Sequence, residues 1–356
     1  MKKINFRGGE TRNTQLNISV ALLKMLMCFE VVCCHFWLYE KTDVPIFLTP
    51  FYVLKDCAVP VFMLLSFFYF YKHLDEMNLN KLMMRIKRLY IPQFVWGVVY
   101  WLLFSLLDIL LKVDHVKGLK SLGWQIFTGH SEALNPSMWY QFDLIILTVL
   151  VSILAIVGKK NITIYSLFIL TIVSLVLQYS GINQMLFGNL IYELKYPIGR
   201  LAEMIPYVFL GLTLKNSEIF YRIQKYRWYV MIFAVSLMVI NSYLFWINKV
   251  GQVRGFSYAG GFLIIMSLCL VTIVFLIPQE VFKSKKIYII SETISRYTLG
   301  IYCMHRLVGR VLKYIMSFLG IQLDTFLLCI IIYLVSYCIS YSMSMIAPKL
   351  SKKLVI

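Results

Sequence analysis

Apolar residues occur along the chain in ten long runs that are separated by short polar segments. The runs cover residues 18–39, 47–71, 90–111, 138–157, 162–179, 197–214, 228–247, 256–277, 297–319 and 326–346. Most have about the 20 apolar residues that an α-helix needs to cross a hydrocarbon core of about 30 Å, and none shows the period-two alternation of a membrane barrel strand. The pattern predicts an all-α integral membrane protein with about ten transmembrane helices.

The polar segments between the runs are short, so we expect residues 1–356 to form a single membrane domain without an appended second domain. The longest segment, 112–137, is predicted to be a loop with a short interfacial helix at 124–127. The first run carries Lys24, Glu30 and His35, and no small-residue cleavage site follows it. It therefore indicates a retained helix and not a signal peptide.

The basic residues indicate an orientation in the membrane. The chain is 60% hydrophobic with a net charge of +18, and most of its 35 lysines and arginines lie between the apolar runs. If the N-terminus is cytoplasmic, the inner segments hold 21 of them and the outer segments hold 7, while the remaining seven lie in or at the ends of the runs. Cytoplasmic loops are rich in Lys and Arg, so both termini (residues 1–17 and 347–356) are expected inside. This explains the charge without a nucleic-acid partner.

The eight cysteines lie within the apolar runs or at their edges. This placement argues against a disulfide framework, and no pair has the spacing of a metal site. We expect apolar core cysteines and no bound metal.

Two ionisable residues in the first run are predicted to share one face of a helix. Lys24 and His35 are eleven residues apart, which is about 20° from a whole number of turns, with roughly 16 Å between them along the axis. One interpretation is a lysine that snorkels to the membrane surface and a hydrogen-bonded core histidine. The other is a functional site, because ionisable groups within spans are costly.

A second basic pair precedes the third run. Arg85 and Arg88 are three residues apart and would share a helix face at the cytoplasmic surface. Guanidinium groups there can hold phosphates bidentately, although stop-transfer signals have the same composition.

Five short motifs occur in an order that resembles the acyltransferase-3 family of membrane O-acyltransferases. They are Lys24 with His35, Arg85 with Arg88, the stretch Val59–Ser66, the pair Trp139–Tyr140, and the set Ser295, Tyr297, Ile301, Tyr302 and His305. Two residues depart from the family pattern. Phe67 replaces a glycine after Ser66, and Glu30 lies where the family is apolar.

The resemblance implies transfer of an acyl group, usually acetyl from cytoplasmic acetyl-CoA, to a hydroxyl of a cell-surface or lipid-linked glycan. It places the protein in the bacterial inner membrane, with acyl-CoA, the glycan and the bilayer as partners. His35 would be the general base, because a neutral imidazole can take the proton of a poorly nucleophilic hydroxyl. Arg85, Arg88 and Lys24 would hold the donor. The expected substrate-binding or cavity-lining residues are Asp56, Ser66, Trp139, Asp143, Tyr302 and His305.

Other polar residues within the runs have less specific roles. Arg200 and Glu203 are three apart and are expected to pair with each other. Arg306, Arg310 and Lys313 give the ninth run a basic outer half. A flippase or carrier of lipid-linked glycans would share the spans and the basic inner face, but we see no broken helices or half-chain symmetry. A glycan polymerase, usually expected to carry a large outer loop, is a further alternative.

Overall fold

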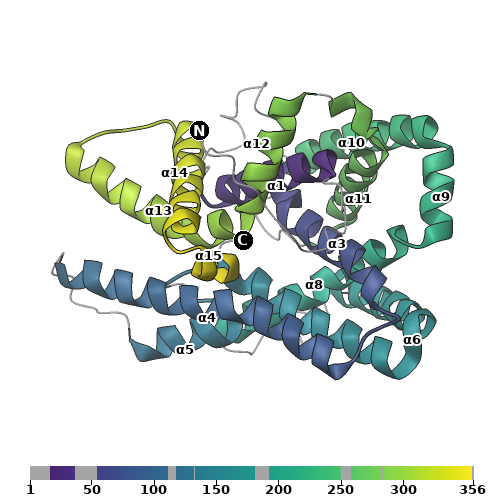
Figure 1. Ribbon diagram of the computed structural model, residues 1–356, viewed down its shortest axis with the longest axis horizontal. Helices are drawn as coiled ribbons and strands as arrows, with labels where there is room; N and C mark the ends of the chain where they lie inside the picture. Colours follow the sequence, from purple (N-terminus) through teal and green to yellow (C-terminus); the bar gives the residue numbers. More distant parts are fainter. Residues whose placement is uncertain are drawn as a thin grey trace, which may run out of the picture.

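The computed structural model describes residues 17–36, 54–110, 118–131, 133–180, 192–249, 258–282 and 284–354. Within these ranges all regular structure is helical (Figure 1). The α-helices are α1 (Ile18–Phe36), α3 (Ala58–Phe70), α4 (Leu79–Leu110), α5 (Leu119–Thr128), α6 (Trp139–Tyr179), α8 (Tyr192–Leu214), α9 (Ser217–Lys225), α10 (Arg227–Lys249), α11 (Gly261–Leu276), α12 (Lys285–Arg296), α13 (Thr298–Leu319), α14 (Thr325–Ile346) and α15 (Pro348–Leu354). Short 3-10 turns lie at Lys55–Cys57 (η3), Tyr71–His73 (η4), Pro136–Met138 (η5) and Gln279–Phe282 (η6).

Each of the ten apolar runs overlaps with one of these helices, or with one half of α6. Five helical stretches of the described residues are long and apolar enough to cross a membrane, at 18–36, 79–109, 136–179, 227–244 and 325–346. The all-helical membrane class is therefore confirmed. The number of ten spans and the side on which the termini lie stay predictions. Residues 1–16 and the first part of the second run lie outside the described residues.

The helix boundaries differ from the apolar runs in two informative places. α4 begins at Leu79, well before the third run, so Arg85 and Arg88 are both helical. The fourth and fifth runs are joined in α6, which is two helices meeting at Lys159, where φ is 56° and ψ is −176°. This backbone conformation is almost restricted to glycine and costs about 1–3 kcal/mol. A polar Lys159–Lys160 pair thus marks a bend and not a straight continuation.

The helix α1 lies between two hydrophobic cores. One row of its side chains (Val20, Leu23, Met27 and Val31) packs into a core with α3, α6, α8 and α11. Another row (Cys28, Val32, Cys33 and Phe36) packs into a core with α4, α13 and α14. A helix that is apolar all round is expected to be buried on more than one side. In Figure 1, α4, α5, α6 and α8 form one side of the molecule, with α10, α11, α12, α13 and α14 on the other.

The helices α1 and α3 run antiparallel. At one end the Cys34 thiol donates to the carbonyl oxygen of Lys55, with an Sγ···O distance of 2.9 Å. At the other end the Lys24 ammonium lies 5.8 Å from the centre of the Tyr69 ring. The close approach of α8 to α3 depends on Gly211, because a Cβ atom there would lie 2.4 Å from the carbonyl oxygen of Leu64.

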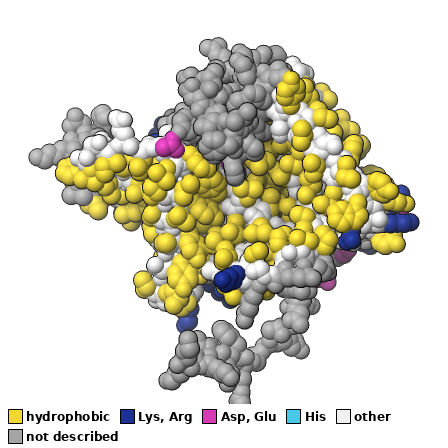
Figure 2. Space-filling model, turned by 90° about the horizontal axis from the view of Figure 1, so that it is seen from above, with side chains coloured by type: hydrophobic (Ala, Val, Ile, Leu, Met, Phe, Trp, Pro, Cys, Tyr) yellow, Lys and Arg dark blue, Asp and Glu magenta, His cyan; other side chains and the backbone are white. Residues whose placement is uncertain are grey.

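The outer surface of the described part is predominantly apolar. Large hydrophobic side chains are exposed along α4, α6, α10 and α14, including Leu102, Ile169, Phe233 and Leu334. Figure 2 shows hydrophobic side chains over wide areas of one face, with lysine and arginine in a few places. An apolar surface of this extent suits a lipid environment, since soluble monomers rarely expose large contiguous apolar patches.

Candidate active site

Two histidines from distant parts of the chain are stacked on each other. His35 lies in the last turn of α1 and His305 lies in α13, with ring centroids 5.2 Å apart and ring planes 25° apart. The close approach of α13 to α1 depends on Gly309, because a Cβ atom there would lie 2.1 Å from an atom of the Phe36 ring. The Phe36 ring in turn meets His305 edge-on, at a centroid distance of 6.4 Å.

The hydrogen bonds of His305 determine which of its nitrogens carries the proton. Nδ1 lies 2.7 Å from the carbonyl oxygen of Tyr302 and 3.3 Å from that of Ile301. Carbonyl oxygens only accept, so Nδ1 is the donor and Nε2 of the neutral ring carries the lone pair. This Nε2 atom is buried and has no hydrogen-bond partner in the described part of the chain. The tautomer of His305 is therefore fixed by the backbone of its own helix.

His35 itself is half-buried. Within the described ranges its ring makes no hydrogen bond, and Arg306 lies within electrostatic reach of both histidines. The ring nitrogens of His35 are thus available to a substrate. The stack on His305 holds the ring in place without occupying them.

A series of ring contacts extends from the histidine pair to the start of α6. Tyr302 lies 6.1 Å from His305 and 6.1 Å from Tyr140, between ring centroids. The Tyr302 hydroxyl donates to the carbonyl oxygen of Ser137 at 2.5 Å, and the Tyr140 hydroxyl is hydrogen-bonded to Ser66. The Trp139 ring lies 6.5 Å from that of Tyr140, between ring centroids. Four of the predicted lining residues, Ser66, Trp139, Tyr302 and His305, therefore belong to one connected wall beside His35.

The predicted donor-binding residues meet at the other end of α3. The ammonium of Lys24 lies over Tyr69, and the Arg85 guanidinium lies 4.2 Å from the centre of the adjacent Phe70 ring. Arg88 is exposed one turn further along α4. The sequence motifs of the first and third runs are thus brought to a single helical turn, although they are distant in the sequence.

Two further lysines at this end were not predicted from the sequence. Lys160 lies 4.1 Å from the centre of the Tyr71 ring, and Lys215 lies 5.0 Å from that of Phe68. Together with Lys24 and Arg85 they surround the last turn of α3, and none of the four makes an ion pair with a described residue. Four uncompensated cations favour an anion at this end of the bundle. In the sequence, a lysine that follows an apolar run indicates only the orientation of the span and not a binding site.

The histidine pair and the cationic residues lie at opposite ends of α1. His35 and Lys24 are eleven residues apart in one continuous helix, which corresponds to roughly 16 Å at 1.5 Å per residue. The antiparallel α3 spans the same interval, from Lys55 beside Cys34 to Tyr69 beside Lys24. Ser66 lies about one turn before the cationic end of α3 and is hydrogen-bonded to Tyr140. Tyr140 also contacts Tyr302, so it connects the cationic end with the histidine pair.

The two predicted aspartates lie in different surroundings. Asp56 is half-buried in η3, within electrostatic reach of Cys34 and of the fully buried Glu30. Asp143 lies one turn into α6 and is fully buried, and neither of its carboxylate oxygens has a hydrogen-bond partner among the described residues. No hydrogen bond joins Asp143 to His35 in the described ranges, so it does not orient that ring directly.

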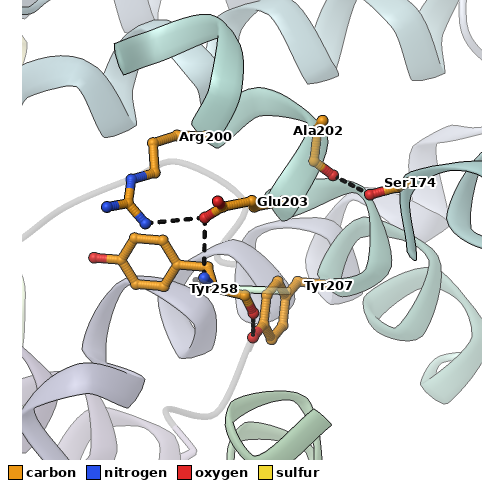
Figure 3. A network of polar contacts seen from close by, with 6 residues as sticks. All are labelled: Ser174, Arg200, Ala202, Glu203, Tyr207 and Tyr258. Carbon is orange, nitrogen blue, oxygen red and sulfur yellow. Dashed lines mark hydrogen bonds and ion pairs between the residues drawn. The ribbon is translucent and has the colours of Figure 1, made fainter. Parts of the chain in front are cut away.

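The ion pair expected between Arg200 and Glu203 is present in α8, with an N···O distance of 2.9 Å. Figure 3 shows that Glu203 Oε2 also accepts the backbone N–H of Tyr258, at 2.9 Å. The Arg200 guanidinium lies 4.6 Å from the centre of the Tyr258 ring and 5.9 Å from that of Trp139. The Tyr207 hydroxyl donates to the carbonyl oxygen of Tyr258 at 2.5 Å. Tyr258 was missed because its partners are more than fifty residues away in the sequence.

These features define a multi-pass membrane protein with a histidine pair at one end of a central helix. At the other end lie cations that have no ion-pair partner among the described residues. A family model described as an acyltransferase domain matches residues 17–345. The chain therefore belongs to the acyltransferase-3 family and is a membrane acyltransferase. Searches of curated proteins and of solved structures find no match to the chain.

Proposed function

We propose that the protein transfers an acetyl group from cytoplasmic acetyl-CoA to a hydroxyl of a cell-surface or lipid-linked glycan in the bacterial inner membrane. The observation that carries the proposal is the His35 ring, stacked on His305 and free of hydrogen bonds to the described residues. It lies at the opposite end of α1 from Lys24 and Arg85, which are cations without ion-pair partners in the described part.

His35 acts as the general base. Its ring accepts the proton of the acceptor hydroxyl as the hydroxyl oxygen attacks the acyl carbon, and it returns the proton to the sulfur as the carbon–sulfur bond breaks. Proton transfer of this kind contributes typically about 10²–10⁴-fold to a rate. His305 is a positioning residue, because its tautomer is fixed by the Tyr302 carbonyl oxygen and its ring supports one face of His35.

The cationic end of α3 binds the donor. Acetyl-CoA supplies an activated acyl group on a carrier with several phosphates, and such a group needs several cations that are not already neutralised. Lys24, Arg85, Lys160 and Lys215 meet this requirement, with Arg88 on the adjacent surface of α4. Arginine can contact phosphate oxygens bidentately, whereas lysine supplies point charges.

The predicted topology gives the reaction a direction across the membrane. With ten spans and both termini inside, the cationic end of α3 faces the cytoplasm and His35 lies toward the outside. Lysine and arginine side chains over aromatic rings are typical of a membrane–water interface. This supports a position of the cationic end of α3 at the membrane surface. The pantetheine arm of the donor would then extend along α1, with the phosphates at the cationic end and the thioester beside His35.

The direct test is acetyl transfer by the purified protein in lipid nanodiscs. The protein is incubated with acetyl-CoA labelled in the acetyl group and with glycan lipids extracted from cells that carry the gene. Label in the glycan fraction, dependent on active protein, is expected. Saturable movement of glycan in proteoliposomes with no transfer of label would contradict the proposal and support a carrier.

A further inference from the structure

The fully buried Asp143 lacks a partner that its burial requires. Its exposed fraction is 0%, and neither Oδ1 nor Oδ2 has a hydrogen-bond partner among the described residues. Leaving a buried carboxylate unsatisfied is costly, and it is rare in proteins unless the group has a function. Neither His35 nor His305 donates a hydrogen bond to the Asp143 carboxylate. A hydrogen-bond donor from outside the described residues is therefore expected beside this side chain.

The surroundings of Asp143 connect the histidine pair with the network of Figure 3. Its carboxylate lies within electrostatic reach of Tyr140 and Tyr302, and also of Arg200 and Glu203. Tyr302 touches His305, which is stacked on His35. A ligand that donates to Asp143 would therefore lie beside the wall that leads to the proposed base.

The Arg200–Glu203 pair is positioned by further contacts and is partly exposed. Glu203 is fixed by the Tyr258 N–H, and the guanidinium is placed over the Tyr258 and Trp139 rings. The side chains of Arg200 and Glu203 are 16% and 11% exposed, respectively. The pair (Figure 3) thus offers donors and acceptors in a defined arrangement, within electrostatic reach of the buried Asp143.

The charge of this cluster selects against anionic ligands. Among the described residues it contains two carboxyl groups, Asp143 and Glu203, and a single guanidinium, Arg200, that is already paired. An anion would meet a surplus of acceptors and no uncommitted cation, whereas hydroxyl groups would supply the donors that Asp143 lacks. At the cationic end of α3, by contrast, the excess charge is positive.

We propose that Asp143 and the Arg200–Glu203 pair form the acceptor subsite, and that it takes an uncharged, hydroxyl-rich sugar and not an anionic one. The inference rests on the proposed function for the role of the sugar as acyl acceptor. It assigns to Arg200 and Glu203 a binding role beyond their mutual pairing. The hydroxyls that bind Asp143 and the hydroxyl that reaches His35 belong to the same saccharide or to neighbouring units.

The first arm of the test identifies the charge of the acetylated sugar. After transfer of labelled acetyl in nanodiscs, the saccharides are released from their carriers and separated by anion exchange into uncharged and anionic pools. We expect the label in the uncharged pool. Label confined to the anionic pool would overturn the inference while leaving the acyltransferase function intact. Absence of label from both pools would overturn the proposed function, and with it the acceptor role of this subsite.

The second arm uses variants at the subsite. Asp143→Asn has the same shape and removes the uncompensated buried carboxylate, so the fold is expected to survive. Glu203→Gln keeps an oxygen for the Tyr258 N–H and supplies a second variant if the first does not accumulate. Each should raise the acceptor KM at least tenfold, with the acetyl-CoA KM changed by less than twofold.

A matched control is available on the surface of α9. Glu218 forms an ion pair with Arg222 at 2.7 Å, and both side chains are 72% exposed. Glu218→Gln therefore makes the same chemical change as Glu203→Gln at a solvated pair, and the acceptor KM should stay at the wild-type value. An unchanged acceptor KM in folded Asp143→Asn and Glu203→Gln, with acetyl transfer still present, would overturn the subsite and leave the proposed function standing.

Discussion

In the proposed reaction His35 is the general base, and His305 only positions the His35 ring. Replacing His305 by asparagine tests this difference between the two roles. The side-chain amide nitrogen of an asparagine lies near the place of the histidine Nδ1. His305→Asn therefore keeps a donor for the Tyr302 carbonyl oxygen, which lies 2.7 Å from Nδ1 in the structure. The change removes the ring that faces His35 at 5.2 Å and the Nε2 acceptor. Helix α13 keeps its backbone contact, so the fold should be retained.

The size of the rate loss distinguishes the two roles of His305. An aromatic pair contributes about 0.5–1.5 kcal/mol beyond its buried area. Loss of the stack should then lower kcat about two- to twelvefold, at 1.4 kcal/mol per factor of ten. If His305 were itself the base, the loss would be about 10²–10⁴-fold. We expect the smaller effect, because His305 Nε2 is buried whereas the His35 ring is only half-buried.

The assay is steady-state transfer of labelled acetyl in nanodiscs, with the acetyl-CoA KM measured in parallel. The kcat should fall by about two- to twelvefold, the range that the lost stack predicts, and the KM for the donor should not change. His73→Asn is the matched control, since His73 is half-buried in η4, beyond the end of α3, and has no role in the proposed reaction. A folded His305→Asn protein with a kcat more than a hundredfold lower would refute the assignment of the two roles.

Three further changes test the donor end and the packing. Arg85→Gln with Arg88→Gln should raise the acetyl-CoA KM about tenfold or more while the acceptor KM stays constant, because each charged hydrogen bond contributes about 1.5–3 kcal/mol. Gly211→Ala should lower stability by about 1–3 kcal/mol, because its Cβ would meet the Leu64 carbonyl oxygen at 2.4 Å. Lys159→Gly should stabilise the protein by about 1 kcal/mol by relieving a φ of 56°. Thermal unfolding in detergent measures the last two.

Each of these predictions has a result that contradicts it. An unchanged donor KM in the double arginine variant would remove the phosphate-binding role, and Lys81→Gln, at an exposed pair with Glu76, is its control. Gly211→Ala at wild-type stability would show that α8 is not held against α3 as closely as described. A lower melting temperature for Lys159→Gly would mean that the bend of α6 is not strained.

Much of the helical framework was predictable from the sequence, because a span must satisfy its backbone internally and be apolar over its whole length. The Arg200–Glu203 pair was also predictable, since residues three apart on a helix are neighbours. The break of α6 at Lys159 was anticipated only as a short loop between two runs. A helix at Arg85 and Arg88 was expected from their spacing, but the start of α4 at Leu79 was not predicted, because basic residues interrupt the apolar pattern of its first turns.

The tertiary relations of the site were not predictable. His35 and His305 lie 270 positions apart, and only the packing of α13 on α1 brings their rings together. The binding of Glu203 to the backbone of Tyr258 has no sequence signal, because a backbone N–H is present at almost every residue. In the sequence, Lys160 and Lys215 are ordinary charges of inner loops. Only the fold brings them over the rings of Tyr71 in η4 and Phe68 in α3.

The central claim is that His35 takes the acceptor proton while the donor is held at the far end of α1. Single-turnover transfer of labelled acetyl by His35→Ala, with acetyl-CoA binding measured on the same sample, tests it most directly. The account predicts a loss of about 10²–10⁴-fold in the transfer rate, with the donor Kd unchanged within twofold. Transfer at the wild-type rate by the folded variant would contradict the account.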